Sequence, residues 1–155
     1  MESLAVGRSA ASPLCVRALM TSAPPIVDQF DAVIDAARRM RATGSKMVAV
    51  TDDRSRFLGI VSDRDIVERS VADGQNPNAV TAGSLVRPGQ PSIDPSRIAD
   101  RALLALIVAQ PLAELPVIDD GRLVGMLTVA DVAVPLIEQC DDEMLDQYWP
   151  DDSVR

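Results

Sequence analysis

The chain has 155 residues, of which 47% are apolar and only 3% aromatic, carries a net charge of −8 and contains no histidine. Its length is sufficient for one well-buried domain, or for two small halves that share a core of aliphatic side chains and methionine. The acidic balance makes nucleic acid an unfavourable partner, and the lack of histidine removes the most common general base and zinc ligand.

Nothing in the sequence indicates membrane insertion, secretion or a cysteine-based metal centre. A transmembrane helix would require a run of about 18 apolar residues, and none is present. The N-terminus, Met1 to Ser12, lacks the basic start and apolar stretch of a secretory signal. Cys15 and Cys140 lie far apart in the chain and form neither a disulfide framework nor a metal-ligand cluster. We therefore expect a cytoplasmic protein without a membrane span.

The first half of the chain is expected to alternate short helices and strands after a loose N-terminal segment, residues 1–13. In chain order the elements are a helical turn at Val16–Met20, an extended segment at Ile26–Val27, a helix over Asp31–Thr43, strands at Met47–Val50 and Phe57–Val61, and a helix over Asp63–Ala72. Val33, Ala36 and Met40 give the first long helix one apolar face, and Gly44 lies where a helix stop is expected.

The second half repeats this order of elements. Asn78–Val86 corresponds to the first helical turn and carries the chain from one half to the next. The elements that follow are a short strand at Ile93, a strongly apolar helix over Ile98–Ala109, strands at Leu115–Ile118 and Leu123–Leu127, and a closing helix over Val129–Cys140 that contains Pro135. Residues 141–155 are expected to form an acidic tail, which includes Trp149.

A duplicated sequence pattern accounts for this symmetry. Gly59-Ile60-Val61-Ser62-Asp63-Arg64-Asp65 and Gly125-Met126-Leu127-Thr128-Val129-Ala130-Asp131 both read glycine, two apolar residues, a hydroxyl, two variable residues and aspartate, at an offset of 125 − 59 = 66. Each repeat is a β-α-β-β-α unit that cannot easily bury both faces of its strands alone. We therefore expect an α/β (α+β) fold in which two pseudo-symmetric repeats, residues 14–76 and 77–140, pack through their sheets, and any functional site should occur in pairs.

The hydroxyl and the aspartate of the repeated pattern have two interpretations. Ser62 and Thr128 can cap the helices that follow, each accepting a hydrogen bond from a free N–H of the first turn, with an acidic residue three positions later. Alternatively, these free N–H groups form an anion site, where the hydroxyl contacts a phosphate and Asp65 or Asp131 accepts hydrogen bonds from a vicinal diol such as ribose. The two interpretations do not exclude each other.

Taken in order and twice over, these motifs resemble a tandem pair of cystathionine-β-synthase (CBS) domains, also called a Bateman module. The residues that carry the resemblance are Gly59–Asp65 with Ile66, Leu115–Asp120 followed by Gly125–Asp131, and Val16–Thr21 before the proline pair. The resemblance covers about residues 14–138. Two departures from the family pattern are Ala49, where the second repeat has Pro116, and Pro111 after the second long helix; both would affect the shape of a cleft.

The resemblance implies that each repeat contributes a cleft for an adenosine-type ligand. In these clefts Ser62 and Thr128 would face phosphate, and Asp65 and Asp131 would contact the ribose hydroxyls. The apolar residues that would enclose the base are Ile26, Val48 and Ile60 in the first cleft, and Ile93, Leu115 and Met126 in the second. For most of these apolar positions, ordinary core packing is an equally good interpretation.

Basic residues near the first repeat's motif predict that the two clefts differ. Arg64 lies between the hydroxyl and the aspartate, and Lys46 lies just before a strand, whereas the second repeat has alanines there, with Glu114 adjacent. Because arginine suits bidentate phosphate contact, we expect the first cleft to prefer a phosphorylated nucleotide. The second cleft would prefer a less charged adenosyl ligand or remain empty. Arg64 can equally be a solvated helix residue.

The leading functional hypothesis is a non-catalytic regulatory module that senses AMP, ADP, ATP or S-adenosylmethionine, without a required cofactor or metal. The family resemblance implies a homodimer paired through helical faces, for which Leu103–Val108 offers an apolar surface unless it is buried within the monomer. With no effector domain in the chain, the readout would be an unidentified effector protein or the module's own assembly. The alternative is a ligand-independent interaction scaffold with vestigial clefts. Catalysis is disfavoured, because neither a nucleophile with an evident base nor a metal cluster is present.

Overall fold

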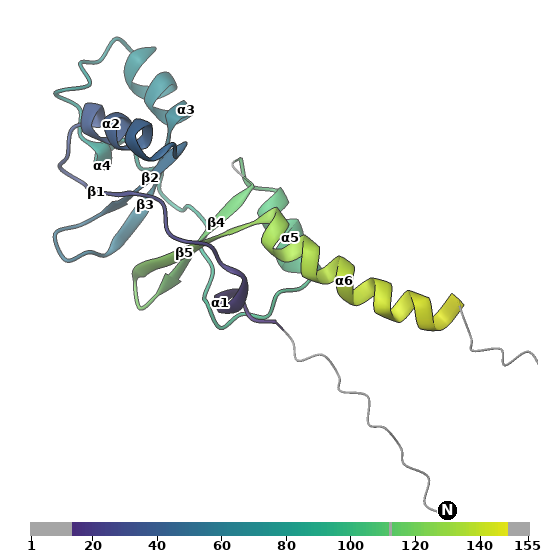
Figure 1. Cartoon of the computed structure of the whole chain (residues 1–155). Helices are drawn as coiled ribbons and strands as arrows, with labels where there is room; N and C mark the ends of the chain where they lie inside the picture. The colour runs from purple at the N-terminus through teal and green to yellow at the C-terminus, as the bar shows by residue number, and fades with distance from the viewer. Residues whose placement is uncertain (1–13, 112, 149–155) are drawn as a thin grey trace, which may run out of the picture.

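Two small sheets form the centre of the structure, a computed structural model that describes residues 14–111 and 113–148 (Figure 1). The first sheet has the strand order β1-β2-β3. Strand β1 (Ile26–Asp28) is parallel to β2 (Met47–Thr51), and β3 (Phe57–Ser62) is antiparallel to β2. Strand β3 is therefore an edge strand, with one side of its backbone free to meet other parts of the chain.

The second sheet consists of β4 (Glu114–Asp119) and β5 (Arg122–Thr128), which are antiparallel. Ile93 forms a single parallel bridge to Val117, at the position that β1 occupies in the first sheet. The strand expected at Ile93 is thus reduced to one bridge. The expected mixed α+β architecture is confirmed, with strands and helices alternating in each repeat.

Helices cover one face of each sheet. In the first repeat these are α2 (Val33–Thr43) and α3 (Asp63–Ile66), and α3 continues directly into a π-helical segment, η1 (Val67–Val71). In the second repeat they are α5 (Arg101–Val108) and α6 (Val129–Tyr148). Within the described ranges, no helix is both long and apolar enough to cross a membrane.

Several helix boundaries differ from those expected. Gly44 ends α2 in the left-handed conformation, at φ +68°, as its place in the sequence predicts. Helix α5 begins three residues later than expected, after Asp100, whose side chain accepts a hydrogen bond from the Leu103 amide. Helix α6 continues beyond Cys140 to Tyr148, so the first part of the expected acidic tail is helical. Trp149 and residues 1–13 lie outside the described residues.

Two short helices are exchanged between the repeats. Helix α1 (Val16–Leu19) packs in the core of the second repeat, where Val16 is fully buried and its amide donates to the Arg97 carbonyl. Helix α4 (Ala82–Leu85) packs in the core of the first repeat, and the Ala82 amide donates to the Asp31 carbonyl. Each core is therefore completed by a helix from the segment that precedes the other repeat's strands.

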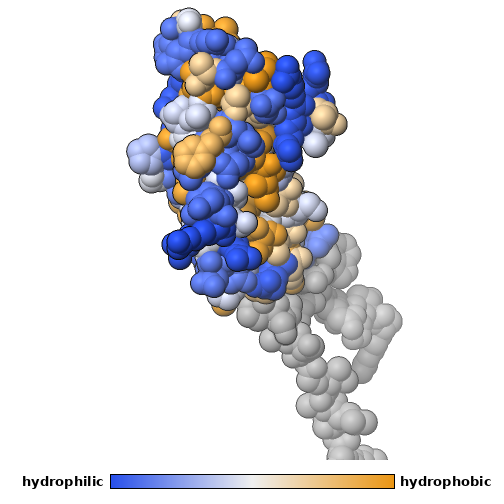
Figure 2. All heavy atoms as spheres, turned by 90° about the vertical axis from the view of Figure 1, so that its left-hand side faces the viewer, coloured by the Kyte–Doolittle hydropathy of each residue, from blue (hydrophilic) through white to orange (hydrophobic). Residues whose placement is uncertain are grey.

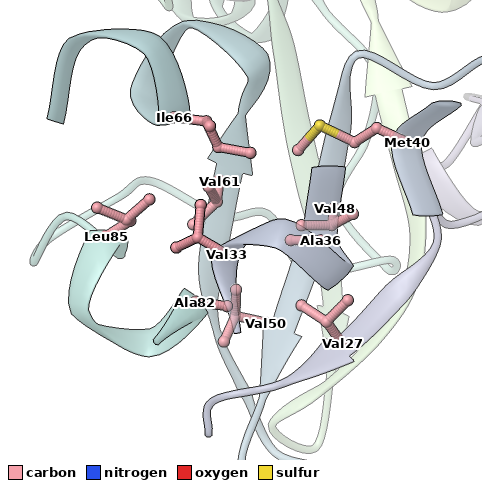
Figure 3. Close-up of a cluster of buried hydrophobic side chains, with 10 residues drawn as sticks. All are labelled: Val27, Val33, Ala36, Met40, Val48, Val50, Val61, Ile66, Ala82 and Leu85. Atoms are coloured by element: carbon pink, nitrogen blue, oxygen red, sulfur yellow. The ribbon is translucent and has the colours of Figure 1, made fainter. Parts of the chain in front are cut away.

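Side chains from strands and helices fill the core of the first repeat, as Figure 3 shows. Its members are Val27, Val33, Ala36, Met40, Val48, Val50, Val61, Ile66, Ala82 and Leu85. The opposite face of this sheet contributes Met47, Ala49 and Ile60 to a separate cluster with Met126 of β5. The two repeats thus pack through their sheets, as expected.

Not all apolar side chains are buried. Seen from the side of the first repeat, the surface has apolar patches between hydrophilic residues (Figure 2). Exposed apolar residues include Phe30, Val67 and Val71 in the first repeat and Val134 and Ile137 in the second. The apolar helix Leu103–Val108 is mostly packed within the monomer, because Leu103 and Ile107 are fully buried and only Val108 of its large side chains is exposed.

The exchange of short helices makes a specific stability prediction. Replacing Leu85, which is 3% exposed in the core of the first repeat, with alanine should lower the free energy of unfolding by about 2–5 kcal/mol through lost burial and a residual cavity. Leu58→Ala, at a 40% exposed position, is the matched control and should cause a clearly smaller loss. Urea denaturation measures both, and equal losses would contradict the exchanged packing.

Candidate functional site

The repeated hydroxyl and aspartate form a capping box at the start of a helix in each repeat. Ser62 Oγ donates to Asp65 Oδ2 at 2.6 Å, the Ser62 amide donates to the same oxygen at 3.0 Å, and the Asp65 amide donates to Ser62 Oγ at 3.2 Å. Thr128 and Asp131 repeat these three hydrogen bonds, at 2.7, 2.7 and 3.3 Å. The capping interpretation is therefore confirmed in both repeats.

The second carboxylate oxygen distinguishes the two aspartates. Asp65 Oδ1 accepts from Arg87 Nε at 2.9 Å and lies 2.7 Å from Arg87 Nη2. Arg87 belongs to the segment that connects the repeats, and the sequence pattern does not single it out. Asp131 Oδ1 has no such partner among the described residues. At the rim, Arg64 Nε is bonded to Glu68 Oε1 at 2.6 Å, so both arginines near Asp65 are paired with carboxylates.

Local contacts shift the pKa values of three groups near the caps. Burial alone raises the pKa of Asp65, but hydrogen bonds from Ser62 and the nearby Arg87 guanidinium outweigh it and hold this pKa below its ordinary value. Burial, and to a lesser degree the charge of Asp131, raises the pKa of Glu114. The hydrogen bond and the charge of Glu68 raise the pKa of Arg64. Asp65 is therefore held as a carboxylate at neutral pH.

A cavity of about 570 Å³, named cavity 1 here, lies between the two repeats beside the first cap. The first repeat contributes Ile60, Ser62, Arg64, Asp65 and Glu68, the connecting segment contributes Arg87–Pro91, and the second repeat contributes Gln110, Pro111, Glu114, Pro116 and Met126. Four residues predicted for the first cleft, Ser62, Arg64, Asp65 and Ile60, are thus brought together with Met126, which the sequence predicts for the second. A ligand of this cavity would contact both repeats at once.

A second space of about 510 Å³, cavity 2, lies beside Thr128. Its walls come from Thr21, Ser22 and Pro24, from Ser45, Lys46 and Met47, and from Pro111, Glu114, Met126 and Thr128. The structure places Lys46, which the sequence assigns to the first cleft, in the lining of cavity 2, because the repeats meet face to face. Glu114 and Met126 form part of both cavities.

Four predicted apolar residues lie outside both cavity linings. Val48 and Leu115 are fully buried against the helices. Ile93 is 6% exposed in the second core, and Ile26 is exposed at the surface outside both cavities. The physical reason for the first two is strand alternation, since neighbouring residues of a strand point to opposite faces. Their neighbours Met47 and Glu114 face the other repeat and line cavities instead. Asp131 caps α6 but lies outside the lining of cavity 2.

Protonation of Asp65 should weaken the fold in acid. Because the folded pKa is depressed, the stabilisation is fully present above the unfolded value, about 3.9, and is lost as the pH falls below it through the lower folded value. Asp65→Asn should therefore be less stable than the wild type at neutral pH, and this difference should shrink in acid. Urea denaturation from about pH 2 to pH 7 tests this, with Asp53→Asn in an exposed turn as control. A difference that is constant with pH would contradict the assignment.

Comparisons with known proteins agree with this architecture. The sequence profile described as CBS domain matches residues 16–72 and again 82–137. The chain is similar to hypoxic response protein 1 of Mycobacterium tuberculosis (strain ATCC 25618 / H37Rv), with 32% identity over 122 residues, which cover 79% of this chain and 85% of the relative. The uncharacterized protein YlbB of Bacillus subtilis (strain 168) is 28% identical over 120 residues, 77% of this chain and 80% of the relative.

Solved structures show the same fold. The crystal structure of Hypoxic Response Protein I with two coordinated zinc ions has a TM-score of 0.70 and 30% identity, covering 79% of this chain and 98% of that protein. The CBS-pair protein CBSX2 from Arabidopsis thaliana has a TM-score of 0.68 and 23% identity, covering 84% of this chain and 99% of that protein.

Among the residues described in this chain, no three His, Cys, Asp or Glu side chains are grouped so that they could hold a metal ion.

CBS-pair proteins are generally regulatory, non-catalytic modules. The profile matches two domains in tandem over most of the chain, and the relatives and solved structures share the same pair arrangement. The chain belongs to the CBS domain family and consists of a tandem CBS pair.

Proposed function

We propose that the chain is a non-catalytic regulatory module that binds an adenine nucleotide or another adenosyl ligand in cavity 1. The observation that carries this proposal is the convergence of a capping hydroxyl, a carboxylate and two arginines on a cavity of about 570 Å³ between the repeats. This volume lies within the range of about 300–1,000 Å³ typical of small-molecule sites. The apolar part of the lining gives a base a surface to contact.

Each lining group has a chemical role in this proposal. Asp65 is a carboxylate and therefore an acceptor for the two hydroxyls of a ribose. Arg64 and Arg87 would contact phosphate, and Ile60, Pro116 and Met126 would enclose the base. Both arginines are already paired with carboxylates, so a phosphate would have to compete with Glu68 and Asp65 for them. This competition favours a ligand that supplies both a phosphate and a diol.

Cavity 2 is proposed as a second and different site. Lys46 lines it and has no ion-pair partner among the described residues, while Thr128 presents its hydroxyl at the start of α6. One cavity therefore contains the two arginines and the other contains the lysine. Positive charge that could contact a phosphate is thus present in both cavities and not in the first alone. Glu114 contributes negative charge to both cavities, which disfavours the most highly charged nucleotides in either.

The regulatory effect would come from the position of cavity 1 between the repeats. A ligand that contacts both repeats stabilises the arrangement that it fits, to the extent of its differential affinity for that arrangement. The change would be read by an unidentified effector protein or by the assembly of the module itself.

The alternative is a ligand-independent interaction scaffold, and one observation favours it. Both carboxylate oxygens of Asp65 are already hydrogen-bonded within the chain, by Ser62 and by Arg87. A site whose polar groups are satisfied in this way is stable when empty. A measurement of ligand binding therefore discriminates between the regulatory module and the interaction scaffold.

We further propose a homodimer, a common assembly of CBS-pair proteins. The helices that follow the two caps expose apolar side chains in both repeats: Val67 and Val71 on η1, and Val134 and Ile137 on α6. Val71 and Ile137 are related by the same offset of 137 − 71 = 66 as the capping motifs. Burying such side chains against a second copy would remove them from water.

The ligand proposal is tested by thermal denaturation with adenosine, AMP, ADP, ATP and S-adenosylmethionine. At a ligand concentration near 100 times Kd, binding should stabilise the native state by about 2.7 kcal/mol, which raises the Tm by several degrees. Asp65→Ala should lose this shift relative to its own ligand-free Tm, and Asp53→Ala in the exposed turn should keep it. Lys46→Ala should reduce only the part of the response contributed by cavity 2. If none of the five ligands raises the Tm, the scaffold function replaces this proposal.

The dimer proposal is tested by light scattering coupled to size-exclusion chromatography. The wild type should have twice the chain mass of 16.6 kDa. Val67→Lys with Val71→Lys should shift the protein towards the monomer, because two charges would be buried in the interface. Val108→Lys, at an exposed position on α5, is the control and should remain dimeric. A monomeric wild type would overturn this part of the proposal.

A further inference from the structure

A side chain covers the free edge of β3 beside cavity 1. The Ile60 amide donates to Gln90 Oε1 at 2.6 Å, and Gln90 Nε2 donates to the Ile60 carbonyl at 2.9 Å. Gln90 thus satisfies a main-chain donor and a main-chain acceptor together with one planar carboxamide. Both residues line the cavity, so this contact is part of its wall.

The second repeat covers the same edge in another way. Met126, which corresponds to Ile60 by the offset of 66, exchanges both hydrogen bonds with the backbone of Thr21, at 2.8 and 3.1 Å. A difference in chain length explains the contrast. Three residues, Thr21–Ala23, separate the end of the α1 region at Met20 from Pro24, whereas four, Arg87–Gln90, separate Val86 from Pro91. Because Arg87–Gln90 is one residue longer than Thr21–Ala23, a side chain and not the backbone meets the strand edge there.

This replacement makes the contact at β3 easier to open. The Thr21 bridge breaks only if the backbone moves, while the Gln90 contact breaks by rotation of a side chain on an exposed segment. The same four residues include Arg87, which donates a hydrogen bond to Asp65 Oδ1, the carboxylate oxygen that Ser62 does not contact. Two polar features of cavity 1 are therefore satisfied by neighbouring side chains of one connecting segment.

We propose that Arg87–Gln90 occupies the polar groups of cavity 1 in place of a ligand and is displaced when a ligand binds. This inference rests on the proposed function of cavity 1. The Ile60 pair fits a planar group with a donor next to an acceptor, which adenine possesses in its amino group and adjacent ring nitrogen. Asp65 fits a vicinal diol once Arg87 has moved. Nucleosides and nucleotides combine both features in one molecule.

Displacement would link occupancy of cavity 1 to the connection between the repeats. Arg87–Gln90 joins α4, which is packed on the first repeat, to the segment that enters the second repeat at Ile93. A ligand that takes the place of Gln90 at Ile60 and of Arg87 at Asp65 releases both contacts, and the released Arg87 guanidinium is then available to a phosphate. Cavity 2 has no corresponding response, because its strand edge is bonded to the Thr21 backbone.

Isothermal titration of AMP and adenosine into the wild type and Gln90→Ala tests the displacement. If the ligand must break two hydrogen bonds of Gln90, removing the carboxamide should tighten binding about fivefold to tenfold. Gln75→Ala is the matched control, because Gln75 is exposed and lies outside the linings of both cavities. Its affinity should remain that of the wild type. Unchanged or weaker binding to Gln90→Ala overturns the inference.

A measurement on the wild type makes the test independent of the variant's stability. In ¹⁵N-labelled protein, the carboxamide signal of Gln90 and the amide signal of Ile60 should both move on saturation with AMP. If AMP binds while the Gln90 signal stays in place, the displacement is wrong and the proposed function stands. If neither AMP nor adenosine binds to either protein, the proposed function fails and this inference fails with it.

Discussion

Each repeat covers one face of its sheet with helices and leaves the other face to the sheet of its partner repeat. Met47, Ala49 and Ile60 of the first sheet meet Met126 of the second, and burial of these side chains holds the repeats together. This contact fixes which residues of one repeat face the motif of the other. The two cavities lie at its margins, so their walls necessarily combine residues from both repeats.

The repeated motif and most of the elements can be predicted from the sequence, because they depend on short spacings within the chain. The capping boxes, for example, need only a hydroxyl and an aspartate three residues apart before a helix. The wall of each cavity cannot be predicted in this way. Lys46 precedes the first repeat's strand in sequence but lines cavity 2, and this placement follows from the packing between sheets.

The position of Val48 and Leu115 outside both cavity linings has a simpler origin. In both strands the sequence is apolar at consecutive positions, so composition does not distinguish the face that meets the helices from the face that meets the other repeat. A shift of one residue exchanges the two faces. Glu114 in the second repeat is the informative exception, since a charged residue within an apolar strand marks the face that is open to a cavity. The π-helical turn of η1 has no evident signal in the sequence.

The two glycines of the motif illustrate how the exchanged segments shape the sequence. A Cβ added to Gly125 would lie 2.6 Å from the Thr21 carbonyl oxygen, and one added to Gly59 would lie 2.7 Å from Gln90 Oε1. Glycine is therefore required at Gly125, where the close atom is backbone, whereas at Gly59 the close atoms belong to the side chains of Val86 and Gln90, which would have to move. The sequence shows the repeated glycine, but the reason for it becomes visible only when the crossing segment is in place.

The crossing of α1 and α4 also bears on how such a chain arises. A single repeat, translated alone, would present a short helix with no groove to receive it and a groove with no helix to fill it. Two identical copies would satisfy each other by trading these helices, in the manner of a domain-swapped dimer. Gene duplication then needs only to tether partners that already interlock.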